Sequence, residues 1–289
     1  MVKAQFTKTI FCLAIVGLVT LASCGEPAEI PHAATLDRTA LMAIVFPNWQ
    51  ESDGQAVQPI ELPMNGGSKE APAETKTNSE ILPLYVVKLS ESHAVMLTQA
   101  LPVDSSGEAL ACHACPGYVG AYSFTRDPSG WRLTARQDAV AEIGVNGSLG
   151  KTQIVRVGEN GFLFTADWGS CWQGYCGHWL ALLGLQPDRA IPYAPHLMLS
   201  AENTGAHEEC GSSPVPAVIS DPAHQCFDVK GIWKIQGDRL VTNFLGHRTD
   251  LDPEGKRLPK KTVKQQAVYR IEKERLVLES GENPVPSDW

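Results

Sequence analysis

Six cysteines between positions 112 and 226 are the residues whose type and spacing best suit chemistry. They occur in three close pairs: Cys112 and Cys115, Cys171 and Cys176, and Cys210 and Cys226. An even number of cysteines in an oxidising compartment is typical of a disulfide framework. Because short loops close at the lowest entropic cost, the spacing favours disulfides within these three pairs over the other connectivities.

Thiol-redox chemistry at Cys112 and Cys115 is one alternative. These residues form a C-x-x-C sequence, which can lower a thiol pKa and exchange disulfides, above all at the start of a helix. Strand patterns surround this sequence, and the chain shows no thioredoxin-like order of strands and helices. The pattern alone therefore favours a structural disulfide, with a periplasmic redox protein as the alternative.

Metal binding is the other alternative for the cysteines. Four histidines lie within three residues of a cysteine, namely His113, His178, His207 and His224. Thiolate and imidazole ligands together suit Cu(I) or zinc. Thiolates must stay reduced to bind a metal, however, and the spacing matches no zinc motif. We therefore expect neither a metal nor a cofactor.

The segment 168–179 is the first candidate for a binding surface, because it holds three of the seven tryptophans. A bridge between Cys171 and Cys176 closes a loop too tight to bury all of these rings within itself. Rigid Trp and Tyr side chains on such a loop suit a binding hot spot for protein or sugar faces. In the alternative interpretation, the rings cover one end of a β core. The candidate residues are Trp168, Trp172, Tyr175, His178 and Trp179.

No sequence motif indicates catalysis. The chain lacks Gly-x-Ser-x-Gly, His-Glu-x-x-His and the paired motifs that accompany Ser-x-x-Lys. Ser170 and His178 are close in sequence, but no acid that would orient the histidine is identifiable. We therefore predict no catalytic residue and favour a function other than catalysis.

A basic cluster follows a loop that partly resembles a calcium-binding loop. Residues 250–255 place oxygens at alternate positions and end in Gly255, but the twelfth position is Lys261 instead of a glutamate. A long hairpin loop is therefore predicted. The basic cluster consists of Lys256, Arg257, Lys260, Lys261 and Lys264. It suits either anionic headgroups and acidic partners or a solvated loop.

The first 24 residues have the pattern of an export signal. Lys3 and Lys8 precede an apolar run of 14 residues, too short to span a bilayer as a mature helix. The run ends in Leu21-Ala22-Ser23-Cys24, which resembles the lipobox of bacterial lipoprotein precursors. The resemblance implies cleavage before Cys24 and acylation of that residue, so two or more acyl chains would anchor the protein stably. Gly25 in place of an aspartate resembles the signal for an outer-membrane lipoprotein facing the periplasm, assuming a Gram-negative host.

Composition and charge narrow the class of partner. The net charge is −8, and it becomes −10 without residues 1–23, which contain two lysines and no acid. Such acidity argues against nucleic-acid binding, which needs basic residues to displace counterions. The expected partners are the membrane, through the N-terminal lipid, and an envelope protein or cell-wall component.

The pattern of the N-terminal third predicts little regular structure. Residues 25–35 are typical of a tether, and a short helix is expected from Asp37 to Phe46, where Pro47 stops it. Residues 52–80 are polar and rich in turn formers, which predicts a flexible linker. The expected organisation is a signal peptide over 1–23, a lipidated tether, helix and linker over 24–80, and a β domain over 81–289.

Alternating apolar residues and turn chemistry dominate from residue 81 onward. Hairpins are expected around residues 90–93, at Asp127-Pro128-Ser129-Gly130 and at Asn160-Gly161. The apolar run 179–185 suits a buried strand or a short helix. Residues 231–242 and 267–278 predict two similar hairpins, which indicates either a repeat or shared pattern rules. Eleven to thirteen short strands predict an all-β antiparallel sandwich or a barrel-like meander stapled by disulfides, with a degenerate propeller as an alternative.

The sequence therefore predicts a lipid-anchored envelope protein whose β domain is a binding module, comparable to inhibitor, immunity or envelope-assembly proteins. That comparison depends on location and size only. The alternatives are a redox or metal-binding protein centred on Cys112 and Cys115, and a structural envelope component without a ligand.

Overall fold

The structure is a computed structural model that describes residues 31–49, 51, 56–63, 75–159, 161–211 and 224–286. The expected signal peptide and lipidated Cys24 lie outside these residues. Among the helices described, none combines the length and the apolar character that crossing a membrane requires.

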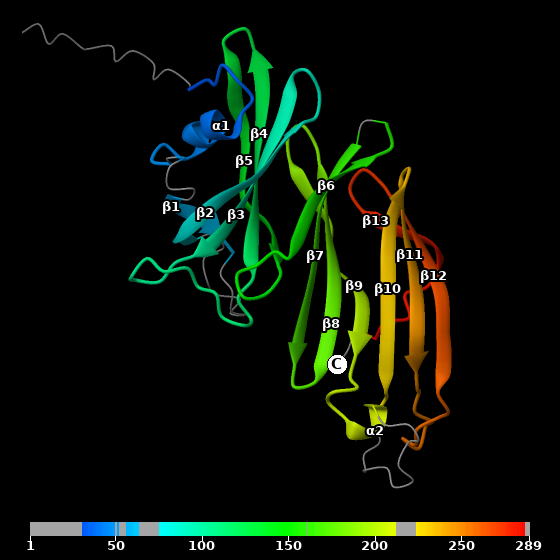
Figure 1. The fold of residues 1–289 in the computed structure, drawn as a ribbon. Coiled ribbons are helices and arrows are strands. Elements are labelled where there is room, and N and C mark those ends of the chain that lie inside the picture. Colours follow the sequence, from blue (N-terminus) through cyan, green and yellow to red (C-terminus); the bar gives the residue numbers. More distant parts are fainter. Residues whose placement is uncertain are drawn as a thin grey trace, which may run out of the picture. The chain divides into compact units, whose positions relative to one another are not determined.

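The fold is all-β and antiparallel, as the alternating pattern predicts (Figure 1). The strands of the five-stranded sheet are β1 (Ala56–Leu62), β2 (Thr75–Lys88), β3 (His93–Pro102), β4 (Gly117–Asp127) and β5 (Gly130–Ile143). The strands of the eight-stranded sheet are β6 (Lys151–Val157), β7 (Gly161–Trp172), β8 (Tyr175–Leu185), β9 (Ala190–Glu202), β10 (Phe227–Gln236), β11 (Arg239–Arg248), β12 (Lys261–Ile271) and β13 (Leu276–Gly281). The helices are α1 (Arg38–Val45) and α2 (Glu208–Gly211).

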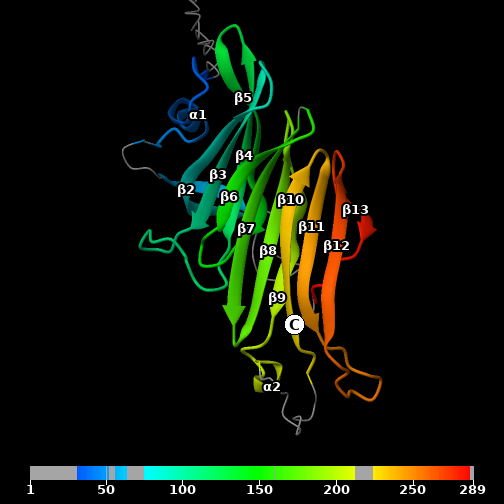
Figure 2. The same ribbon diagram turned by 45° about the vertical axis from the view of Figure 1, so that its right-hand side comes forward.

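Each sheet is a meander, because every strand pairs with its neighbours along the chain (Figure 2). The eight-stranded sheet curls into a half-barrel. Its strands follow one another in a single sheet, so the described residues do not form the separate blades of a propeller. The hairpins β10–β11 and β12–β13 lie side by side within this sheet, as the two similar segments predict.

Local turn chemistry decides several of these hairpins. The backbone N–H of Leu89 donates to the carbonyl of His93 at 2.9 Å, which closes the expected turn between β2 and β3. The Asp127 carboxylate accepts from the Ser129 backbone N–H at 2.8 Å in the turn between β4 and β5. The apolar run 179–185 forms part of strand β8 and not a helix, since both of its neighbours pair with it in the sheet.

The linker expected over residues 52–80 is wrong where the structure describes it. Strand β1 occupies Ala56–Leu62, and β2 begins at Thr75. Ile60 and Leu62 alternate with more exposed residues and enter the core. Pro59 is tolerated because β1 is an edge strand that pairs only with β2. Long-range pairing with β2 thus overrides the polar composition of this segment.

The short helix is confirmed as α1. Its N-cap is Asp37, whose carboxylate accepts from the Ala40 backbone N–H at 2.9 Å and so satisfies one free donor of the first turn. Leu41, Met42 and Val45 are buried against the five-stranded sheet.

Three apolar clusters build the core. The first lies between α1 and the five-stranded sheet and contains Phe124. The second lies between the two sheets and contains Phe164 of β7 and Leu183 of β8. The third lies inside the curled sheet and contains Phe244. Trp172 belongs to none of these clusters, and Tyr175 is only partly buried against the third, because the β7–β8 hairpin extends past the core between the sheets.

All three predicted disulfides are confirmed. Cys112 bonds to Cys115, with 4.9 Å between the Cα atoms, in the connection between β3 and β4. Cys171 bonds to Cys176 across the β7–β8 hairpin. Cys210 bonds to Cys226 across 16 residues and joins α2 to the start of β10. In this oxidised form, none of the six cysteines offers a thiolate.

Candidate binding site

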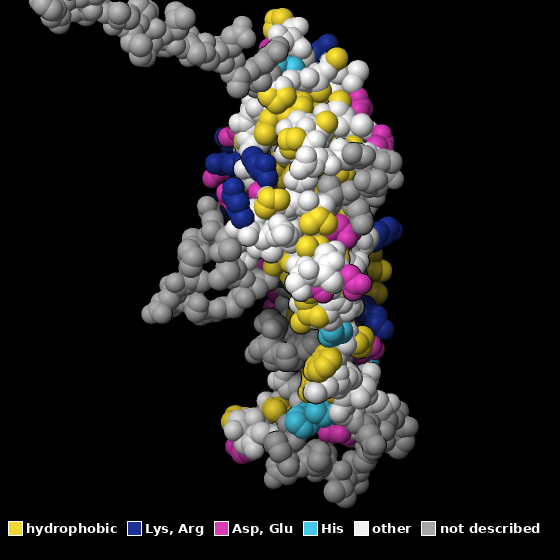
Figure 3. Space-filling view, turned by 90° about the vertical axis from the view of Figure 1, so that its left-hand side faces the viewer, with side chains coloured by type: hydrophobic (Ala, Val, Ile, Leu, Met, Phe, Trp, Pro, Cys, Tyr) yellow, Lys and Arg dark blue, Asp and Glu magenta, His cyan; other side chains and the backbone are white. Residues whose placement is uncertain are grey.

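The β7–β8 hairpin aligns the predicted aromatic residues through its pleat and its turn. Across the ladder, Trp172 pairs with Tyr175 and Trp168 pairs with Trp179. Residues two apart on a strand share a face, so all four side chains project from one side of the hairpin. Figure 3 views the molecule from the left of Figure 1, and toward its lower end histidine side chains lie beside apolar ones.

A tight turn holds the end of this hairpin. Gln173 and Gly174 both have positive φ, 49° and 84°, which is the backbone of a two-residue hairpin turn that matches strand twist. A Cβ at Gly174 would lie 2.2 Å from the backbone of Gly205, so the loop after β9 packs directly against the turn. Together with the adjacent Cys171–Cys176 disulfide, these contacts fix the direction in which the aromatic side chains point.

The inner part of the site is a stacked pair of indoles. The rings of Trp168 and Trp179 lie 4.4 Å apart with 18° between their planes. The ring of Trp179 lies over Gly177, where a Cβ would approach it to 2.2 Å, so only glycine permits this stacking. The indole nitrogen of Trp168 is buried and has no hydrogen-bond partner among the described residues.

The outer part of the site is Trp172, which is 63% exposed. Its ring lies 5.2 Å from the ring of His113, which the β3–β4 connection brings from the other sheet. The His113 Nε2 also lies 3.4 Å from the Ser170 hydroxyl. The Cys112–Cys115 disulfide closes the loop that carries His113, so two disulfides hold the two sides of this contact.

These residues line a cavity of about 450 Å³. The lining comprises His113, Ala114, Val145, Trp168, Ser170, Trp172, Tyr175, Trp179 and Met198. Four aromatic rings dominate it, with the Ser170 hydroxyl and the His113 imidazole beside them. Such a surface can stack on a sugar ring or receive an apolar side chain of another protein, and it presents few charges to desolvate.

His178 does not join the other four predicted residues. It pairs with Gly169 across the ladder and therefore projects from the opposite face of the hairpin. There its Nε2 lies 2.5 Å from the Asp167 carboxylate, which also accepts from the Trp233 indole N–H at 2.9 Å. Asp167 is thus the acid beside His178 that could not be identified from the sequence.

Ser170 and His178 do not form a catalytic pair. Ser170 is on the aromatic face with His113, whereas His178 and Asp167 are on the face toward the inside of the curled sheet. No group of three or more His, Cys, Asp or Glu side chains within the described part of the chain is placed to hold a metal ion.

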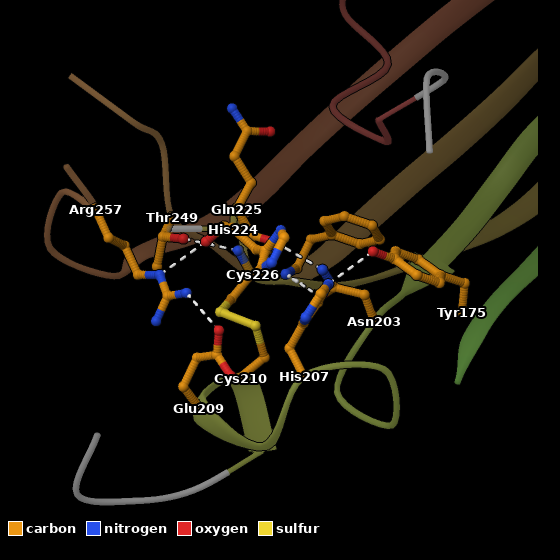
Figure 4. Close-up of a disulfide and its surroundings, with 11 residues drawn as sticks. Tyr175, Asn203, His207, Glu209, Cys210, His224, Gln225, Cys226, Thr249 and Arg257 are labelled. Atoms are coloured by element: carbon orange, nitrogen blue, oxygen red, sulfur yellow. Dashed lines mark hydrogen bonds and ion pairs between the residues drawn. A yellow bond between two sulfur atoms is a disulfide. The ribbon is translucent and has the colours of Figure 1, made fainter. Parts of the chain in front are cut away.

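A line of rings continues from the site toward the third disulfide. The Tyr175 hydroxyl lies 2.7 Å from His207 Nε2, and the His207 ring stacks on His224 at 3.8 Å (Figure 4). Burial lowers the pKa of His207, and the neighbouring His224 lowers it further. His207 is therefore predominantly neutral near pH 7.

Sequence reasoning missed the contributions of His113, Val145 and Met198 to the aromatic cavity. These residues come from the β3–β4 connection, the β5–β6 connection and β9, far from the hairpin in sequence. The sequence drew attention to His113 only as part of the C-x-x-C sequence, and it gave no indication of the other two residues.

A search for known relatives finds no matching family model, no matching curated protein and no matching solved structure.

Proposed function

We propose that this chain is a lipid-anchored protein of the bacterial cell envelope whose β domain is a binding module. Its aromatic cavity on the β7–β8 hairpin is the binding surface, and an envelope protein or a cell-wall component is the partner. The observation that carries this proposal is Trp172, a large ring that is 63% exposed on a hairpin end held by a disulfide.

Two physical arguments support this choice. An exposed tryptophan costs solvation free energy unless a partner covers it, and rigid rings lose little conformational entropy on binding. The turn at Gln173 and Gly174 and the disulfide beside it hold the ring in place before binding. Binding through Trp172 therefore needs little reorganisation of the protein.

Affinity capture from cross-linked cells tests the binding surface. The wild-type protein, Trp172→Ala and a matched control, Ile232→Ala, are compared. Ile232 is 72% exposed on β10 and lies outside the aromatic cavity. We expect one captured envelope component whose yield falls at least about tenfold in Trp172→Ala and stays unchanged in Ile232→Ala, because central tryptophans dominate hot spots. Equal yields for all three proteins would refute the proposed surface.

The membrane anchor has its own test. Incorporation of labelled palmitate and the fraction of protein in the membrane are measured for the wild type and for Cys24→Ala. We expect the substitution to abolish both signals, because the lipobox resemblance places the acyl chains on Cys24. Labelled palmitate retained by Cys24→Ala would show that the anchor is elsewhere.

A further inference from the structure

A second cavity, of about 490 Å³, lies at the other side of the Cys210–Cys226 disulfide. The loop between β11 and β12 forms much of its wall, through Lys256, Arg257, Leu258 and Lys260. His247 of β11 and the disulfide complete it. It shares no described residue with the lining of the aromatic cavity.

Arg257 is the central feature of this cavity, because its side chain is only 5% exposed. Its Nε donates to the backbone carbonyl of His224 at 2.8 Å, and its Nη2 lies 3.3 Å from the Glu209 carboxylate (Figure 4). Its third nitrogen, Nη1, is buried and has no partner among the described residues. A buried guanidinium with an unsatisfied N–H group costs free energy that an anionic acceptor offsets.

Two further cations line the same cavity. Lys256 and Lys260 are exposed, and neither forms an ion pair with any residue that the structure describes. The two acids in the wall are already engaged. Glu209 pairs with Arg257, and the Asp252 carboxylate accepts the backbone N–H groups of Glu254 and Lys256. The charged side chains of the wall are therefore three cations, Lys256, Arg257 and Lys260, against two acids, so the lining has a net positive charge.

The remainder of the wall is apolar. Leu258, Pro259 and the sulfur atoms of the Cys210–Cys226 disulfide supply carbon and sulfur surface beside the cations. A simple inorganic anion would leave this surface in contact with water. A ligand that carries both a charged and an apolar group uses the whole cavity.

We propose that this cavity binds a small organic anion, a phosphate monoester or carboxylate attached to an apolar group. The anionic group contacts Lys256, Lys260 and the free Nη1 of Arg257, and the apolar group lies on Leu258 and the disulfide. The basic cluster of the sequence thus divides in two. Lys256, Arg257 and Lys260 face the ligand, whereas Lys261 pairs with Asp250 at 2.7 Å and Lys264 projects from β12.

Isothermal titration calorimetry on the full chain in neutral dodecyl-maltoside micelles tests this proposal. The probes are phenyl phosphate, benzoate, inorganic phosphate and benzyl alcohol. We expect saturable binding of phenyl phosphate or benzoate, at least about tenfold tighter than either inorganic phosphate or benzyl alcohol, because only the aryl anions supply both groups. Absence of binding by both aryl anions, or binding of inorganic phosphate with equal affinity, overturns the proposal.

The matched variants are Lys256→Gln with Lys260→Gln, and Lys264→Gln as the control. Arg257 itself is left unchanged, because it pairs with Glu209 and its loss risks unfolding. We expect the double variant to weaken binding of the aryl anion about tenfold or more and Lys264→Gln to change it less than about twofold. Equal affinities in the two variants would place the aryl anion elsewhere.

Vesicles of phosphatidylglycerol form a separate arm of the experiment. If the protein binds these vesicles but none of the small anions, the cations belong to a membrane-binding surface and the proposal is overturned.

Discussion

The five-stranded sheet and the eight-stranded sheet are built from similar strands but are covered to different extents. The five-stranded sheet is covered on one face by α1 and on the other by the eight-stranded sheet, so its large rings, such as Phe124 and Tyr122, are fully buried. The eight-stranded sheet is covered only in part. Its β7–β8 hairpin and its β11–β12 connection extend into solvent and carry the two cavities.

This difference separates side chains that are enclosed from side chains that are accessible. Side chains that two layers enclose contribute to the free energy of unfolding but are not accessible to a partner. Side chains at uncovered strand ends add less to stability and remain available for binding. The five-stranded sheet contributes to the aromatic cavity through two connections, the disulfide-closed β3–β4 loop with His113 and the β5–β6 connection with Val145.

Removal of a large ring from each sheet should show the largest contrast. Phe124→Ala should lower the free energy of unfolding by about 3–5 kcal/mol, since it leaves a cavity in a fully buried cluster. Trp172→Ala should lower it by less than about 1 kcal/mol, because Trp172 is 63% exposed. Urea denaturation of both variants measures these values. A comparable loss from Trp172→Ala would mean that this ring covers the core and does not serve recognition.

Removal of single disulfides should give the next contrast. Replacing Cys210 and Cys226 by serine should cost about 3 kcal/mol, because that bond closes the longer loop, 16 residues apart. The same change at Cys112 and Cys115, three residues apart, should cost about 2 kcal/mol. Denaturation without reductant compares the two double variants with the wild type. The reverse order would show that strain or packing, and not loop closure, determines their contributions.

Removal of a tyrosine hydroxyl tests the same difference with a single oxygen atom. Tyr122 donates at 3.0 Å to the buried carboxylate of Asp138, which Arg136 also contacts. Tyr122→Phe should therefore cost about 1–3 kcal/mol. Tyr175→Phe, which removes the contact with the half-buried His207, should cost about 1 kcal/mol or less. Thermal or urea unfolding of the two variants measures both losses of free energy. Equal losses would contradict the expected difference in stability contribution between the two sheets.

The pH dependence of stability should come chiefly from the eight-stranded sheet. Burial lowers the pKa of His196, and burial together with neighbouring cationic groups lowers the pKa of His207 and His247. The unfolded chain then binds more protons than the folded protein, so the free energy of unfolding decreases as pH falls below about 6.5. Burial raises the pKa of Glu142 in the five-stranded sheet, which acts in the opposite direction at lower pH.

Urea midpoints between about pH 7.5 and pH 5 measure this effect. His207→Gln should flatten the decline, because glutamine does not titrate, whereas His93→Gln at the start of β3, whose ring contacts serine hydroxyls, serves as a control. A slope that is identical in the two variants would exclude His207 as its source.

Local physics made the hairpins and the disulfides predictable. A turn such as Asp127–Gly130 needs only the conformational preferences of its own residues, and the closure entropy of a short loop depends only on its length. The same reasoning failed for β1, because Ile60 enters a core made by distant strands. It also failed for His178, whose partner Asp167 is apparent only once the ladder places both side chains on one face.

From residue 81 onward, the sequence by itself determined the antiparallel strand pattern, its turns and the local disulfide pairs, because each depends on residues within one hairpin. It also determined the acidic charge and the lipobox resemblance at Cys24. Only the tertiary structure decided which face of each strand is buried, since that depends on which sheet packs over it. For the same reason, only the tertiary structure shows that Trp172 is exposed to solvent beside His113. It likewise shows that Arg257 is buried beside two exposed lysines.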